Sequence, residues 1–196
     1  MPARLTLATV ITMLRIVLVP IFGVMWAGGR YRAALAIFAS AAATDLIDGF
    51  IARYFQQKTE LGALLDAAAD KIMLLVSYLV AAATGAVPVW IAALVIGRDM
   101  VMVFGAGLFK IALPGRYDPE KWRPSRLGKY ATFLHVFVIV MALSIRAFAL
   151  PDLLPWLQSI ILCAAVLTVT SAAQYFTVGL QALLRPPKEE RKDVHA

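Results

Sequence analysis

Four aspartates stand inside long apolar stretches of this sequence, where an acidic side chain is costly. Asp45 and Asp48 lie in one stretch, and Asp66 and Asp70 lie in the next. An aspartate at the centre of a membrane helix costs about 2.5–3.5 kcal/mol, so function is the usual reason for its presence. Ion pairing is the alternative explanation for one or two of the four acids, but it does not explain their spacing. The candidate partners are Arg15, Lys71 and Arg98.

The spacing puts the acids and several small residues on one face of each of two helices. In the first stretch, that face holds Asp45, Asp48, Gly49, Ala52 and Arg53. In the second stretch, it holds Gly62, Asp66 and Asp70. These residues recur at intervals of three, four, seven and eight, which share a face on a helix. Because only a short segment joins the stretches, the helices should run antiparallel, with four carboxylates converging in one pocket.

Four oxygen donors without Cys or His suit hard divalent cations, so we expect Mg²⁺ or Mn²⁺, as one ion or as a pair. Two such ions would suit a displacement at phosphorus, because they neutralise the charge that develops on phosphate oxygens. Arg53 can pair with a phosphate. Gly49, Ala52 and Gly62 would let a ligand approach the backbone. Tight helix packing is the alternative role for these three small residues.

The composition indicates that these helices cross a membrane. Of 196 residues, 61% are hydrophobic and 16% are charged, whereas soluble domains are about half apolar and a quarter charged. One Cys and two His argue against a disulfide scaffold and against a histidine-built metal site. We therefore expect an all-α integral membrane protein with six transmembrane helices. They should span roughly residues 5–27, 33–55, 60–85, 88–111, 127–149 and 153–183.

The basic residues predict the orientation of these helices. Most Lys and Arg lie near the N-terminus, in 54–60, in 111–126 and in the tail, whereas Arg30, Arg32 and Arg146 fall on the opposite side. The positive side of a membrane protein is usually cytoplasmic, so we expect both termini there. We expect a membrane domain over 1–184 and a charged cytoplasmic tail over 185–196. The net charge of +7 suits anionic membrane lipids, and we expect no nucleic-acid partner.

Residues 45–70 read D-L-I-D-G-F-I-A-R-Y-F-Q-Q-K-T-E-L-G-A-L-L-D-A-A-A-D. This segment resembles the signature of the CDP-alcohol phosphatidyltransferases, D-x2-D-G-x2-A-R-x8-G-x3-D-x3-D, and matches every specified position. The resemblance implies transfer of a phosphatidyl or related group from a CDP-linked donor to a second alcohol, with release of CMP. It also implies a homodimer in the plasma (inner) membrane, with an active site facing the cytoplasm.

The resemblance assigns roles to residues of this sequence. The implied ligands of two divalent ions are Asp45, Asp48, Asp66 and Asp70. Asp70 is also the implied general base for the incoming hydroxyl. The residues implied to border the CDP group are Asp48, Gly49, Ala52, Arg53 and Gly62.

Other segments resemble the branch of this family that makes phosphatidylglycerophosphate. They are Thr12-Met13-Leu14-Arg15, Gly97-Arg98-Asp99, and Ser125 to Thr132 with its S-x-x-G-K-x-x-T pattern. We therefore expect CDP-diacylglycerol as donor and sn-glycerol 3-phosphate as acceptor. The acceptor phosphate needs cations, for which Arg98, Arg126 and Lys129 are candidates.

Several alternatives stay open at this stage. Arg98 could instead pair with Asp99, and Thr132 could bond within its own helix. We interpret His135 as a packing residue with a satisfied hydrogen bond. The acceptor could be phosphatidylglycerol, as in cardiolipin synthesis, or inositol phosphate, inositol or serine. An ion or proton transporter would also place acids in its helices, although its polar groups should reach through both halves of the membrane.

Overall fold

The computed structural model describes residues 7–54, 60–112 and 126–184. Within these ranges, some residues are described by their backbone alone, namely 7–11, 45–54, 60–64, 67, 106, 108–110, 112, 126 and 182–184. The described chain is helical and contains no strand. The helices are α1 (Leu7–Ala27), α2 (Tyr31–Tyr54), α3 (Glu60–Ala83), α4 (Val89–Ala112), α5 (Arg126–Phe148), the short 3₁₀ helix η2 (Pro151–Leu153) and α6 (Leu154–Leu184). The six α-helices confirm the six predicted helical stretches to within a few residues at each end.

The chain divides into two compact units. The first comprises Met1–Ala92 and Val136–Ile160, and the second comprises Ala93–His135 and Ile161–Ala196. The boundary therefore falls inside α4, α5 and α6. The four aspartates of the signature belong to the first unit, whereas Arg98, Arg126 and Lys129 belong to the second. Each unit is described by itself below.

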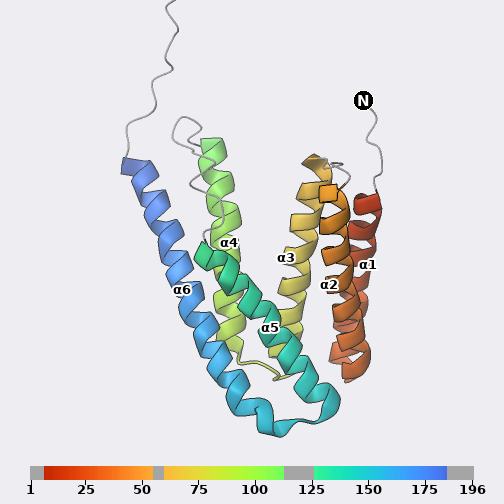
Figure 1. The fold of residues 1–196 in the computed structure, drawn as a ribbon. Coiled ribbons are helices and arrows are strands. Elements are labelled where there is room, and N and C mark those ends of the chain that lie inside the picture. Colours follow the sequence, from red (N-terminus) through yellow and green to blue (C-terminus); the bar gives the residue numbers. More distant parts are fainter. Residues whose placement is uncertain (1–6, 55–59, 113–125, 185–196) are drawn as a thin grey trace, which may run out of the picture. The chain divides into compact units, whose positions relative to one another are not determined.

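In the first unit, α1 packs against both α2 and α3 (Figure 1). Phe22 of α1 contacts Phe38 of α2, with ring centroids 5.7 Å apart, and it contacts Trp26 edge-on at 5.6 Å. On the side toward α3, Gly23 faces Val76, and a Cβ at this glycine would stand only 3.3 Å from the valine side chain. A small residue therefore permits the close approach of α1 and α3.

Three helices each bury a stripe of side chains at alternating intervals of three and four residues, the spacing of a helix that packs along one face. The stripe of α1 is Thr12, Arg15, Val19, Phe22 and Trp26. The stripe of α5 is Gly128, Ala131, His135, Val138, Ala142 and Ile145, and Ile139 and Leu143 beside it are buried as well. The stripe of α6 is Leu157, Ile161, Ala164, Thr168, Ser171 and Tyr175.

Several polar side chains lie inside the stripes, and many large apolar side chains lie outside them. Arg15, His135 and Ser171 are buried, whereas Val24 and Phe176 are mostly exposed. The number of exposed large apolar side chains, together with polar groups in the interior, suits an apolar surrounding. Within the described residues, two helical segments are long and apolar enough to cross a membrane, Leu127–Phe148 and Pro151–Gln181. A membrane protein agrees with both observations.

Two arginines tie the helix ends of the first unit together. Arg32 of α2 donates from Nε to the carbonyl of Ala147 at 3.1 Å, near the end of α5. Arg146 of α5 donates to the carbonyl of Thr84 at 3.1 Å and to the Tyr31 hydroxyl at 3.4 Å. Because the last carbonyls of a helix have no partner within it, these arginines satisfy acceptors at the ends of α3 and α5.

The connections between helices use the left-handed backbone conformation. Gly29 and Gly85 have φ angles of +74° and +66°, and Ala149 has a φ of +52°. Glycine adopts the left-handed conformation without strain, whereas for a residue with a Cβ this conformation costs about 1–2 kcal/mol. After α3, Ala86 donates its N–H to the Ala81 carbonyl at 2.7 Å, which is the bond of a Schellman cap.

We predict that Gly85→Ala lowers the thermal midpoint of the protein in detergent by about 2–4 °C, since it strains the cap by roughly 1 kcal/mol. Ala149→Gly should leave the midpoint unchanged or raise it, because it relieves strain while making the unfolded chain more flexible. Equal midpoints for Gly85→Ala and the unaltered protein would contradict this account of the cap.

Candidate active site

A buried arginine joins the last two acids of the signature. Arg15 of α1 is 3% exposed, and its Nη1 donates to Oδ1 of Asp66 at 3.0 Å and to Oδ1 of Asp70 at 2.8 Å. The two carboxylates lie one turn apart on α3 and are 45% and 54% exposed. The structure thus contains the ion pairing that the sequence offered as an alternative explanation for some of the acids.

This geometry also bears on metal binding. One nitrogen atom of Arg15 contacts both carboxylates, so a single cationic centre can reach Asp66 and Asp70 together. Both side chains are partly open rather than sealed in the core, and carboxylate oxygens are the donors that Mg²⁺ and Mn²⁺ prefer. The two acids therefore fit as part of a divalent-cation site. Among the side chains that the structure describes, no group of three or more His, Cys, Asp or Glu is close enough to hold a metal.

The remaining signature residues are placed by their backbone alone. Five of them lie on α2 and one lies on α3, so the backbone is helical where the spacing predicted it. Their side chains are outside the described residues. These residues are Asp45, Asp48, Gly49, Ala52, Arg53 and Gly62.

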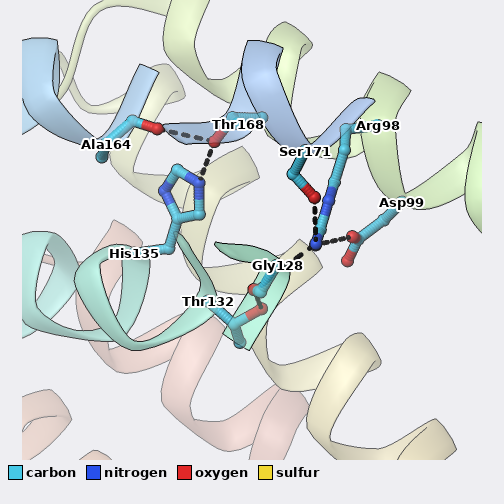
Figure 2. Close-up of polar contacts among 8 residues, drawn as sticks. All are labelled: Arg98, Asp99, Gly128, Thr132, His135, Ala164, Thr168 and Ser171. Atoms are coloured by element: carbon cyan, nitrogen blue, oxygen red, sulfur yellow. Dashed lines mark hydrogen bonds and ion pairs between the residues drawn. The ribbon is translucent and has the colours of Figure 1, made fainter. Parts of the chain in front are cut away.

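The second unit holds a buried cluster around Arg98 (Figure 2). The Arg98 side chain is 7% exposed, and its Nη1 pairs with Asp99 at 2.8 Å. Its Nη2 donates to the Ser171 hydroxyl at 3.3 Å and, in a longer contact of 3.5 Å, to the carbonyl of Gly128. Thr132 donates to the same carbonyl at 3.0 Å. The predicted bond of Thr132 within its own helix is confirmed, and the pairing of Arg98 with Asp99 is present.

A second polar contact joins α5 to α6 next to this cluster (Figure 2). Nε2 of His135 lies 2.7 Å from the Thr168 hydroxyl, which itself donates to the carbonyl of Ala164 at 2.7 Å. A hydroxyl has one hydrogen, so Thr168 must accept from His135, whose Nε2 carries the proton. His135 is buried and hydrogen-bonded, which confirms its interpretation as a packing residue.

The other two candidate cations of the acceptor site lie in the first turn of α5. Lys129 is exposed, and the backbone of Arg126 begins the helix while its side chain is outside the described residues. The structure thus brings Asp66, Asp70 and Arg15 together in one unit, and it brings Arg98 to the start of α5 in the other.

Sequence reasoning missed Ser171 and Thr168 of α6. Both look like ordinary helix hydroxyls, which commonly bond to their own backbone. One signal pointed to them: with Ala164 and Tyr175, they recur at intervals of three and four. This spacing marks a packed face of the helix, where hydroxyls are placed to bond across to a neighbouring helix.

The position of Arg15 predicts how the acids contribute to stability. In EDTA, Asp66→Asn or Asp70→Asn alone should change the thermal midpoint little, because Arg15 keeps a carboxylate partner in each variant. The double variant should lose more than the sum of the single losses, by about 2 kcal/mol, since it removes the ion pairs with Asp66 and Asp70 together from a buried guanidinium. Asp152→Asn, at an exposed residue of η2, is the control. Additive losses would contradict the bridging role of Arg15.

Comparisons with known proteins match this chain to one family. The CDP-alcohol phosphatidyltransferase family profile matches residues 5–172. The chain is 32% identical to a CDP-diacylglycerol–glycerol-3-phosphate 3-phosphatidyltransferase of Pseudomonas fluorescens, over 96% of this chain and 97% of the relative. It is 34% identical to the enzyme of the same name from Yersinia pestis, over 93% of this chain and the full length of the relative.

Relatives with a different name also match. The chain is 30% identical to the CMP-forming cardiolipin synthase of Rattus norvegicus over 89% of its length, and it spans 61% of the length of that relative. The human cardiolipin synthase is 29% identical, and the chain spans 62% of it. The family match covers most of the sequence, including the signature acids, Arg15 and the Arg98 cluster, and so this chain belongs to the CDP-alcohol phosphatidyltransferase family.

Proposed function

We propose that the protein transfers a phosphatidyl group from CDP-diacylglycerol to sn-glycerol 3-phosphate, giving phosphatidylglycerophosphate and CMP. The observation that carries this proposal is the pair Asp66 and Asp70, which meet at one cationic centre at the end of the matched signature. The bacterial relatives that the chain covers over nearly their whole length are named for this reaction.

The reaction requires that a hydroxyl of the acceptor attack the phosphorus that carries diacylglycerol. The new O–P bond forms as the bond from this phosphorus to the CMP oxygen breaks, and CMP leaves with the negative charge. Asp70 accepts the proton of the hydroxyl as general base. It is half-exposed, so an incoming alcohol can reach it, and the neighbouring Arg15 holds its carboxylate in place.

The residues that would hold divalent cations are Asp45, Asp48, Asp66 and Asp70. Such ions, when bound, neutralise phosphate charge and orient the reacting oxygens. The residues that would border the CDP group are Asp48, Gly49, Ala52, Arg53 and Gly62. Arg53 offers a guanidinium to the donor phosphates, and the small residues leave room beside the backbone.

The acceptor differs from a neutral alcohol in bringing its own phosphate. The start of α5 suits this group, because the free N–H groups of a first helical turn and its basic side chains both attract anions. Arg126 and Lys129 would contact the phosphate there. Arg98, bonded to the Gly128 carbonyl between them, would support the same turn.

We further propose six membrane-spanning helices with both termini in the cytoplasm, a site that faces the cytoplasm across the plasma (inner) membrane, and a homodimer. Lipid substrates would then reach the site from within the bilayer. The polar residues within the buried stripes and the exposed apolar side chains of α1, α5 and α6 support membrane insertion. The excess of Lys and Arg in the segments assigned to the cytoplasm supports this orientation.

Phosphatidylglycerol is the second candidate acceptor, and the match to cardiolipin synthases favours it. This acceptor also carries a phosphate, so cations near α5 do not distinguish it from glycerol 3-phosphate. Coverage does favour glycerol 3-phosphate: the bacterial relatives are matched over 97–100% of their length, whereas the cardiolipin synthases are matched over about 60%. Transport of ions is disfavoured by the family assignment.

Purified protein with CDP-diacylglycerol should release CMP only when Mg²⁺ or Mn²⁺ is present, and fastest with sn-glycerol 3-phosphate. The comparison set is phosphatidylglycerol, inositol, inositol phosphate and serine. EDTA should stop the reaction, and added metal should restore it. Faster release with phosphatidylglycerol would overturn the proposed acceptor, and no release with any alcohol would overturn the proposed enzyme.

In the same assay, Asp66→Asn and Asp70→Asn should each lower kcat by at least about a hundredfold, while the kcat of Asp152→Asn should stay within about twofold of that of the unaltered protein.

The proposed topology predicts which residues a membrane-impermeant maleimide can label in spheroplasts of a bacterial host. In a Cys163→Ala background, Asp152→Cys should be labelled from outside. Lys188→Cys should be labelled only after the membrane is opened. Labelling of both positions in sealed spheroplasts, or of Lys188→Cys alone, would contradict the proposed orientation.

A further inference from the structure

Ser171 uses its hydroxyl differently from the neighbouring hydroxyls of α6. Thr168 and Thr170 donate to carbonyls four residues earlier in their own helix, each at 2.7 Å. Ser171 is fully buried, and the hydrogen bond that the structure gives it comes from Nη2 of Arg98, on another helix (Figure 2). This bond joins α6 to α4, whereas the hydroxyl bonds of Thr168 and Thr170 to carbonyls stay within α6.

Arg98 connects this hydroxyl to the start of α5. Its Nη2 reaches both Ser171 and the carbonyl of Gly128, while Nη1 is held by Asp99. A planar guanidinium has its donors in a fixed fork, so an acceptor at one nitrogen restricts the orientation of the whole group. Ser171 and Asp99 together therefore set the direction from which Arg98 meets Gly128.

The Gly128 carbonyl lies in the first turn of α5, one residue before Lys129 and two residues after Arg126. Thr132 donates to the same carbonyl from within the helix. This one oxygen therefore accepts a bond from the next turn of α5 and a bond from Arg98 of α4. A shift of this turn would move the backbone that carries both basic residues.

We propose that Ser171 is a positioning residue for the acceptor: through Arg98 it holds the first turn of α5, and so orients Arg126 and Lys129 toward the acceptor phosphate. This inference rests on the proposed function, because it takes the phosphate of glycerol 3-phosphate as the ligand of that turn. It assigns a role in acceptor recognition to α6, which lies outside the signature.

The test is steady-state kinetics of purified Ser171→Ala, following CMP release. The KM for sn-glycerol 3-phosphate should rise about three- to tenfold, which corresponds to the loss of one hydrogen bond to a charged group at a long distance. The KM for CDP-diacylglycerol and kcat should stay within about twofold of the unaltered protein. Ser171→Thr, which keeps the hydroxyl, should restore most of the acceptor KM.

Ser159→Ala is the matched control, since this exposed serine of α6 donates to the carbonyl of Pro155 in its own helix; it should leave both KM values unchanged. An unchanged acceptor KM in Ser171→Ala would overturn the inference. A matching rise in the KM for CDP-diacylglycerol, or a fall in kcat together with the thermal midpoint, would also overturn it by showing a general structural role.

A double-variant cycle tests the route through Arg98. In an Arg98→Lys background, which keeps the charge but not the fork, Ser171→Ala should change the acceptor KM by less than about twofold. An undiminished effect in that background would overturn the route. Failure of the proposed function is distinguishable, because in that case the unaltered protein would release no CMP in response to glycerol 3-phosphate, and the inference would fall with it.

Discussion

The bridge from Arg15 to Asp66 and Asp70 is the interaction on which the first unit depends. It places a guanidinium that is 3% exposed between α1 and α3, where an unpaired charge would be very costly. The same contact holds two signature acids at a fixed separation. The ion pairs thus join α3 to α1, which also packs on α2, and they fix the positions of two signature carboxylates.

Polar groups in the buried stripes recur in both units. Arg15 stands in the stripe of α1, His135 in that of α5, and Ser171 in that of α6. Where the surrounding medium is apolar, burial of apolar surface adds little to helix association, so packing of small residues and hydrogen bonds between helices carry the specificity. The close approach at Gly23 and the bond from Arg98 to Ser171 are examples of these two effects.

The helices could be predicted from the sequence because each apolar stretch is longer than a soluble core helix needs, and because Gly and Pro mark the breaks. The spacing that puts Asp66 and Asp70 on one face of α3 agrees with their shared contact to Arg15. The sequence did not predict which acids pair with Arg15. Asp66 and Asp70 lie 51 and 55 positions away along the chain, and other acids were equally possible partners. Ser171 was missed because its contact depends on which turn of α6 meets α4. The positive φ of Ala149 could not be predicted, because alanine rarely adopts this conformation.

The separation of Arg15 from its acids along the chain has a consequence for biogenesis. In the proposed membrane topology, α1 enters the membrane before α3 is made, so this guanidinium must first be accommodated without Asp66 or Asp70. An arginine at the centre of a membrane helix costs about 2.5–3.5 kcal/mol, which the apolar residues of α1 have to outweigh. Once α3 is made, Asp66 and Asp70 can pair with Arg15. This pairing favours the packing of α3 against an α1 that is already in place.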